Sequence, residues 1–243
     1  MKMLAFANRN AKEILRDPLN LAFGLGFPLV LILLLSAIQA NVPVALFEIQ
    51  HLTPGVTVFG LSFISLFSAT VISKDRGISF LQRLYTTPLT PADFILGYTL
   101  PILPIALAQC GVCYIAAVFL GLHVTVNILY ATLLILPVSL LFIAIGLLCG
   151  SILNDKQVGG ICGALLTNAS AWLSGIWFDL GLIGGSFQKI AYVLPFVHAV
   201  EMERAALAGD FPGIFPHIWW VLGYTVITLA LAVLLFLRQM RKQ

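Results

Sequence analysis

Few side chains in this sequence have the type and spacing that metal or redox chemistry requires. Cys110 and Cys113 are separated by two residues, a spacing found in metal-binding and redox pairs, but no His or acidic residue adjoins them. His198 and Glu201 stand three residues apart, so on a helix both could bind one metal ion from the same face. We favour close packing for the two cysteines and a local hydrogen bond or a solvated face for His198, and we expect no metal site.

Nucleotide-binding and hydrolytic motifs are also missing. The phosphate-binding loop G-x-x-x-x-G-K-[ST] needs a Gly-Lys dipeptide, and the chain contains none. Neither G-x-S-x-G nor H-E-x-x-H occurs, which disfavours an intramembrane hydrolase or transferase. We predict that the chain has no catalytic residues, holds no cofactor and is not an enzyme by itself.

The elements that position these residues follow from composition: 60% of the 243 residues are hydrophobic and 9% are charged, against about 45–50% and about 25% in a soluble domain. Six uncharged apolar runs each approach the roughly 20 residues that an α-helix needs to cross a bilayer. Lipid offers the backbone no hydrogen-bond partner, so each run must be helical. We predict an all-α polytopic membrane protein, a single domain over residues 1–243, with six transmembrane helices at 22–40, 55–73, 97–120, 128–150, 158–177 and 218–237.

The basic residues indicate how these helices are oriented. Only two of the 13 Lys and Arg residues, Lys189 and Arg204, fall in the connections on one side, and the others fall on the opposite side or at the termini. Because basic loops stay in the cytoplasm, both termini are predicted to be cytoplasmic and the protein to lie in the cell membrane. The net charge of +3 is too small for a nucleic-acid partner.

Residues 1–18 are predicted to form an amphipathic helix in the headgroup layer of the bilayer. Apolar and charged side chains fall on opposite faces, and only Phe6 breaks the pattern. Asp17-Pro18 should end this helix and turn the chain into the bilayer. A basic tail with chance periodicity is the alternative. On the outside, the region 178–216 is too apolar for a solvated loop and is predicted to hold re-entrant or interfacial helices.

The cytoplasmic segment 77–87 carries a second amphipathic pattern. If it is helical, Phe80, Leu81, Leu84 and Tyr85 share one wide apolar face. Such a face must be covered by lipid or by a groove on a partner protein. Thr90 should then cap the next helix, with Asp93 at its third position.

Two of the apolar runs carry patterned faces. Three phenylalanines lie on one stripe of the second run, and the fifth run has a face of small residues edged by polar or aromatic side chains. Plain packing within one subunit explains both patterns. No run contains Asp, Glu, Lys or Arg, which disfavours ion-coupled transport and suits a hydrophobic or amphiphilic cargo.

Several short motifs occur along the chain in a specific order and spacing: LRDP at 15–18, LTPG at 52–55, KDRG at 74–77, LQRL at 81–84, TPL at 87–89 and LPFVH at 194–198. In these motifs and in the six-span plan the chain resembles the permease subunits of type-2 ATP-binding-cassette exporters, in the branch of bacterial drug and natural-product exporters. The resemblance covers essentially the whole chain. One departure is Lys74-Asp75-Arg76, where the family usually has acidic residues on both sides of an Arg.

This resemblance implies the type-2 exporter permease fold and an ATP-driven export function in a bacterial inner membrane. Residues 1–18 would be a connecting helix, and residues 77–87 a coupling helix that docks on an ATPase subunit. Two ATPase subunits would bind Mg-ATP beneath two permeases, most simply a homodimer, with the second and fifth spans lining a cargo cavity between them. The candidate substrate-path residues on these two spans are Phe59, Phe63, Phe67, Asn168 and Trp172. The residues assigned to coupling are Arg76, Gly77, Phe80, Leu81, Arg83, Leu84 and Tyr85.

The expected cargo is a drug, antibiotic, lipid or peptide-like compound that is hydrophobic or amphiphilic. A non-transporting sensor or regulatory membrane protein of the same architecture is the alternative, because the sequence pattern of the fold does not itself report flux.

Overall fold

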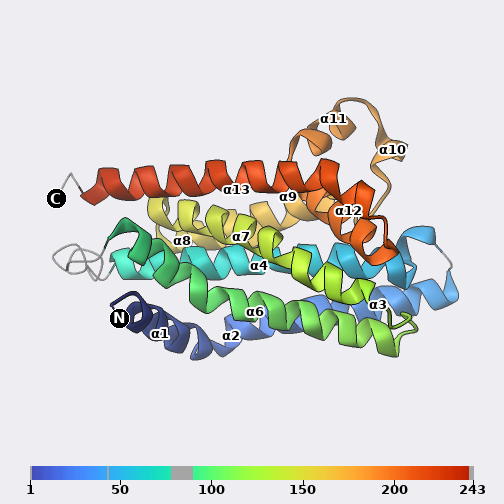
Figure 1. Ribbon diagram of the computed structural model, residues 1–243, viewed down its shortest axis with the longest axis horizontal. Coiled ribbons are helices and arrows are strands. Elements are labelled where there is room, and N and C mark those ends of the chain that lie inside the picture. Colours follow the sequence, from blue (N-terminus) through green and yellow to red (C-terminus); the bar gives the residue numbers. More distant parts are fainter. Residues whose placement is uncertain (1, 43, 78–89, 241–243) are drawn as a thin grey trace.

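The computed structural model describes residues 2–42, 44–77 and 90–240, and every regular element within these ranges is a helix (Figure 1). The all-helical class predicted from the sequence is therefore confirmed. The elements are α1 (Lys2–Leu15), α2 (Pro18–Leu21), the π-helix η1 (Ala22–Gly26), α3 (Phe27–Asn41), the 3-10 helix η2 (Ala45–Phe47), α4 (Ile49–Gly77), α6 (Pro91–Phe119), α7 (Asn127–Ile152), α8 (Asp155–Val158), the π-helix η3 (Gly159–Leu166), α9 (Thr167–Trp172), α10 (Leu180–Ile183), α11 (Gly185–Val193), α12 (Pro195–Ala208) and α13 (Phe211–Met240).

Within the described ranges, five helical stretches are long and apolar enough to cross a bilayer, which makes the chain a multi-pass membrane protein. Each of them contains or overlaps one of the predicted runs. The first joins α2, η1 and α3 into one continuous stretch, which begins where Asp17 caps α2 at the predicted Asp17-Pro18 boundary. The five stretches are Pro18–Asn41, Ile49–Gly77, Ala92–Phe119, Asn127–Ile152 and Phe211–Arg238.

The predicted span 158–177 is shorter in the structure. Helical winding runs through α8, η3 and α9 but ends at Trp172, and the following turn contains Gly175 at a φ of +72°, a conformation that glycine adopts readily. Beyond this turn Trp177 folds back toward α4, with its ring 6.0 Å from that of Phe59. With this shorter helix as a sixth element, the arrangement is broadly the predicted one.

Helix α4 is the centre of the bundle. In the most apolar window of Ile49–Gly77, 89% of the residues are buried, compared with 22% in Pro18–Asn41 and in Phe211–Arg238. Helix α7 approaches α4 closely at Gly146, which has no side chain. A Cβ at this position would lie 2.4 Å from the backbone oxygen of Ser65, so only glycine fits there. Cys110 and Cys113 are buried in the apolar clusters around α4, as their assignment to packing predicts.

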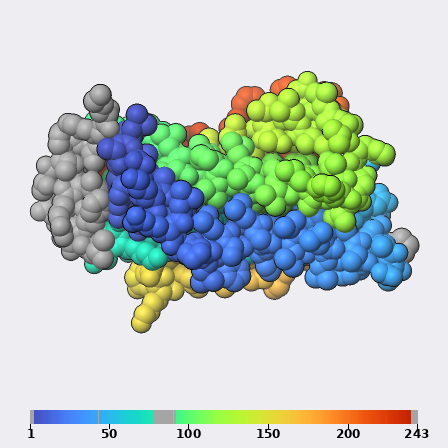
Figure 2. Space-filling view, turned by 90° about the horizontal axis from the view of Figure 1, so that it is seen from below, coloured from blue at the N-terminus to red at the C-terminus, as the bar shows by residue number. Residues whose placement is uncertain are grey.

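Different helices lie at the two ends of the bundle. The start of α1 and the end of α13 lie together at one end, as the predicted orientation requires, and α10, α11 and α12 gather at the other (Figure 1). At the first of these ends, α1 lies against the beginning of α6 (Figure 2). This end also carries the C-terminus of α4, from which the chain enters the predicted coupling segment.

Candidate functional site

The predicted coupling residues divide between described and undescribed parts of the chain. Arg76 and Gly77 form the C-terminal end of α4. On the far side of the segment, Thr90 caps α6, its Oγ1 accepting a hydrogen bond from the backbone N–H of Asp93 at 3.2 Å, as predicted. The structure therefore defines the ends of the two helices that flank the segment, α4 and α6. The other coupling residues, Phe80, Leu81, Arg83, Leu84 and Tyr85, lie outside the described residues.

A buried ion pair joins α4 to α1 immediately before this segment. Arg9 donates from Nη1 to Oδ2 of Asp75 at 2.5 Å and from Nη2 to Oδ1 at 2.6 Å. The Asp75 side chain is completely buried, whereas that of Arg9 is 34% exposed. Two parallel N–H···O bonds to a carboxylate fix the relative orientation of the groups as well as their distance. The pair therefore holds α1 at a defined angle to the end of α4.

Helix α6 completes the junction. The hydroxyl of Tyr98 donates to Oδ2 of Asp75 at 2.7 Å, so that one carboxylate receives bonds from two other helices. Residues 75 and 98 belong to the helices that enter and leave the predicted coupling segment. We call Arg9, Asp75 and Tyr98 the Asp75 junction.

The electrostatics of α1 reflect this arrangement. Partial burial of the Arg9 guanidinium opposes its charge, but the hydrogen bond and the negative charge of Asp75 outweigh that cost, and the pKa of Arg9 is raised. Glu13 is also bound by Arg9, at 2.8 Å, and partial burial raises the pKa of Glu13 although the guanidinium acts in the opposite direction. Arg9 thus stays charged and pairs with both carboxylates.

Apolar and amide contacts lock α1 onto α6 beside the junction. Asn10 donates to the backbone oxygen of Gly97 at 3.0 Å. The Phe6 ring lies so close to Gly97 that a Cβ there would be 2.2 Å from it, and it also makes an edge contact with Tyr98 at 4.9 Å between ring centroids. Phe6, which breaks the amphipathic pattern of α1, is therefore buried against protein rather than against lipid.

Lys74, Asp75 and Arg76 contact four different elements. The Arg76 guanidinium donates to the backbone oxygens of Ser151, Ile152 and Leu153, at 3.2 Å and 2.6 Å for the last two. These carbonyls end α7, where a cation is stabilised by the helix dipole. Lys74 Nζ lies 3.8 Å from Oδ2 of Asp17, the residue that caps α2. The KDR tripeptide therefore ties the end of α4 to α2, α1, α6 and α7.

Sequence reasoning assigned Asp75 only to a motif and did not identify Arg9, Asn10 or Tyr98 as site residues. One signal was present: Asp75 continues the buried stripe of α4 that includes Ile64 and Ile72 at helical spacing. A carboxylate on such a stripe needs a buried partner. The identity of that partner depends on tertiary packing, because Arg9 lies 66 residues away in the sequence.

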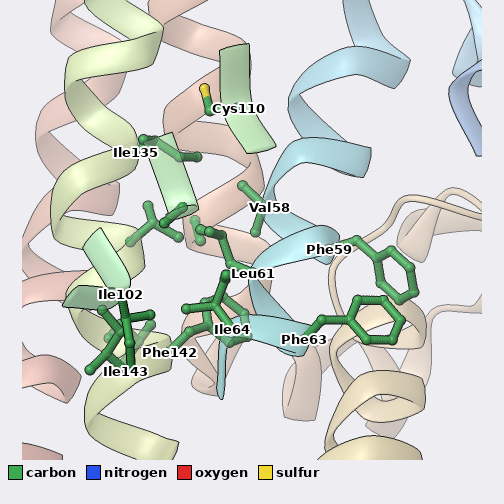
Figure 3. Packing of buried hydrophobic residues seen from close by; sticks show 14 of the residues in the cluster. Val58, Phe59, Leu61, Phe63, Ile64, Ile102, Cys110, Ile135, Phe142 and Ile143 are labelled. Carbon is green, nitrogen blue, oxygen red and sulfur yellow. The ribbon is translucent and has the colours of Figure 1, made fainter. Parts of the chain in front are cut away.

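The predicted substrate-path phenylalanines form a cluster on one side of α4. Phe59 and Phe63 meet edge to face, with centroids 5.9 Å apart, and they project to the same side of the helix (Figure 3). Phe27 from α3 covers both rings, at 6.2 Å and 5.4 Å, and a Cβ at Gly24 would lie 2.6 Å from the Phe67 ring. In this conformation the stripe is buried under α3 and η1, and Phe67 borders a cavity of about 250 Å³ that Ile14 and Lys74 also line.

The other two predicted path residues lie apart from this cluster. Asn168 is exposed and its amide donates to the backbone oxygen of Ala164 at 2.8 Å. Trp172 is 56% exposed. The aromatic residue from this region that does contact the cluster is Trp177, through Phe59.

His198 lies at the opposite end of the bundle and is held by hydrogen bonds to protein groups. Its Nε2 is 2.9 Å from the backbone oxygen of Tyr192, and its Nδ1 is 2.8 Å from Nδ1 of His217. Because a carbonyl only accepts, Nε2 must be the donor, and in the neutral pair His217 donates to His198. Glu201 pairs with Arg204 at 2.8 Å. The expected local hydrogen bond at His198 is confirmed.

The chain matches the sequence profile of a known protein family. A profile of that family, described as "ABC-2 type transporter", matches residues 1–208. The chain is also similar to nodulation protein J of Rhizobium meliloti (strain 1021), with 24% identity over 230 residues that cover 93% of this chain and 85% of that protein.

Proposed function

Since the chain belongs to the ABC-2 type transporter family, as a membrane component in a bacterial inner membrane, we propose that it exports a hydrophobic or amphiphilic compound using ATP hydrolysed on a separate subunit. The family requires an ABC ATPase partner, and the sequence has no phosphate-binding loop of its own. Two ATPase subunits would bind Mg-ATP, and this chain would convert their movement into a change of helix arrangement.

The Asp75 junction is the observation that carries this proposal. The segment 78–89 connects α4 to α6, and these two helices are joined just above it through Tyr98 and Asp75. A partner that displaces the segment therefore acts on both helices together and, through Arg9, on α1. Hydrogen-bonded helices transmit a displacement along their length because their packed interiors are stiff. Movement of α4 would then reach the Phe59 and Phe63 cluster further along the same helix.

Exposed apolar faces beside α4 are available to a second permease copy as well as to lipid. On α3, Val30, Leu33 and Leu34 are exposed, and on η3 and α9 the exposed residues include Leu165 and Trp172. These two faces flank the helix that carries the predicted path residues. A second copy set against them would enclose a space between the permeases, into which Asn168 and Trp172 would point if the faces are paired.

Reconstitution tests the proposed function directly. The chain is co-purified with ABC ATPases encoded by its host and incorporated into lipid vesicles containing a candidate amphiphile. ATP-dependent movement of that compound is expected with the complex and is absent with the permease alone. Stable binding of an ATPase without flux of any amphiphile would favour a sensor, and failure to bind any ATPase would contradict the coupling role.

A further inference from the structure

A cavity of about 690 Å³ lies at the end of the bundle opposite the Asp75 junction. Residues of η2, α4, α10, α11, α12 and α13 line it, at the end where α10, α11 and α12 gather in Figure 1. Small-molecule sites in proteins typically occupy about 300–1,000 Å³. The predicted topology places this cavity on the outer side of the membrane, where exported cargo leaves.

One part of the cavity lining is apolar. Leu180 and Val197 belong to a compact cluster with Ala191, and they are 5% and 1% exposed. Leu46 faces the same cavity from η2. This lining can accept the hydrophobic body of a ligand, because apolar surface is stabilised when it leaves water.

The other part of the lining has an excess of negative charge. It contains three carboxylates, Asp179, Glu201 and Asp210, and one guanidinium, that of Arg204. Asp179 and Asp210 accept bonds from the backbone N–H groups of Gly181 and Gly213, at 2.7 Å and 3.2 Å. Among the described residues, neither of these two aspartates forms a salt bridge; both side chains are exposed, so a ligand in the cavity can pair with them.

The single guanidinium is already engaged by protein groups. Arg204 donates from Nη1 to Glu201 at 2.8 Å, and from Nε and Nη2 to the backbone oxygens of His51 and Gly175, both at 3.3 Å. It therefore holds α12 to the start of α4 and to the turn that follows α9. An anionic ligand would meet two aspartates without gaining this cation, whereas a cationic ligand would gain favourable charge interactions.

We propose that this cavity binds a lipophilic organic cation, with the apolar body against Leu180 and Val197 and the charge toward Asp179 and Asp210. The inference rests on the proposed export function and narrows its cargo to amphiphilic cations at the outer end of the path. Tyr192 also lines the cavity, and the face of its ring can stabilise an onium group.

Two lipophilic ions of the same shape and opposite charge test this assignment. Binding of tetraphenylphosphonium and of tetraphenylborate is measured on the full chain in lipid nanodiscs, without ATPase or ATP. The test variant is Asp179→Asn with Asp210→Asn, because asparagine caps a helix as well as aspartate and only the charge is removed. Asp155→Asn, which removes one carboxylate at the first position of α8, is the control.

We expect saturable binding of the phosphonium, at least about tenfold weaker in the double variant and unchanged in the control, because two nearby charges are lost. Equal binding of the borate would overturn the assignment, and so would phosphonium binding that the double variant does not weaken. Displacement by calcium that is itself lost in the double variant would identify a metal-ion site instead and reject the organic cation.

This experiment separates the inference from the proposed function. If the permease binds no phosphonium but the complex with its ATPase moves another amphiphile in an ATP-dependent way, only the cation-binding role of the cavity is rejected. If the cavity binds the phosphonium but no ATP-dependent flux is found, the export function fails and the binding site stands.

Discussion

Arg9 and Asp75 are 66 residues apart in sequence and form a two-point ion pair, with distances of 2.5 Å and 2.6 Å, at the end of the bundle that is predicted to be cytoplasmic. The carboxylate is completely buried, so it depends on these bonds and on the Tyr98 hydroxyl in place of water. A short amphipathic helix is thereby made part of the folded bundle rather than only an anchor in the headgroup layer.

Asp75→Asn is expected to destabilise the permease by about 3 kcal/mol, because it leaves the Arg9 charge without its buried partner. Tyr98→Phe removes a single bond to a charged group and should cost less, about 1.5–3 kcal/mol. Thermal unfolding in detergent, followed by intrinsic fluorescence, measures both changes. The double variant Arg9→Gln with Asp75→Asn should cost less than the sum of the single variants, and strict additivity would contradict a direct pair.

Gly97→Ala is expected to push α1 away from α6, because the new methyl group would lie 2.2 Å from the Phe6 ring. The loss should appear as a lower unfolding temperature and weaker co-purification with the ATPase. Gly111→Ala is the matched control, since it lies on the same helix and a Cβ there has no atom within 4 Å. Phe6→Ala should restore docking of α1 in the Gly97→Ala background, and no rescue would mean that the contact is not the cause.

Leu84→Asp is expected to abolish cargo-stimulated ATPase activity of the complex while the permease remains folded. A charge in the apolar face predicted for residues 77–87 removes the burial that docking on the ATPase would provide. ATP hydrolysis with and without cargo gives the readout. Val124→Asp, at a position that is 78% exposed between α6 and α7, should leave the rate unchanged. An unaltered stimulated rate in Leu84→Asp would remove this segment from the coupling pathway.

Acidification is expected to weaken the contact between α12 and α13. Burial lowers the pKa of His198 below its ordinary 6.5, with His217 acting in the same direction and the Tyr192 carbonyl and Glu201 in the opposite one. The unfolded chain then binds the proton more readily than the folded one, so stability falls as the pH drops below 6.5. Unfolding temperatures measured across that range should fall less in His198→Gln, and parallel curves would exclude His198 as the cause.

Local sequence signals predicted the helical elements well because they depend on short-range patterns. Apolar runs located the five long stretches, and Thr90 with Asp93 marked the start of α6. The common stripe of Phe59 and Phe63 also followed from helical spacing. These features need no knowledge of which helices are neighbours.

The contacts of the site depend on neighbours and were not predictable in this way. Phe27 covers the phenylalanine stripe only because α3 lies against α4, and Asn168 lies apart from the stripe, exposed and bonded to Ala164 of its own helical stretch. One local hint, besides Asp75 on the buried stripe of α4, was Phe6, which lies outside the apolar face of α1. Its partner on α6 could not be identified from spacing alone.

The two π-helices, η1 and η3, provide a way for the helices beside α4 to rotate. Gly24 of η1 faces Phe67, and Gly163 of η3 faces Leu66, so both wide turns lie against the same stretch of α4. Each π turn holds one residue more than an α turn. Rewinding one of them as α-helix would advance the following segment by about 1.5 Å and swivel it by about 100°. Helix α3 would then rotate as one rigid body with its hydrogen bonds intact, and Phe27 would lose its contact with the Phe63 ring.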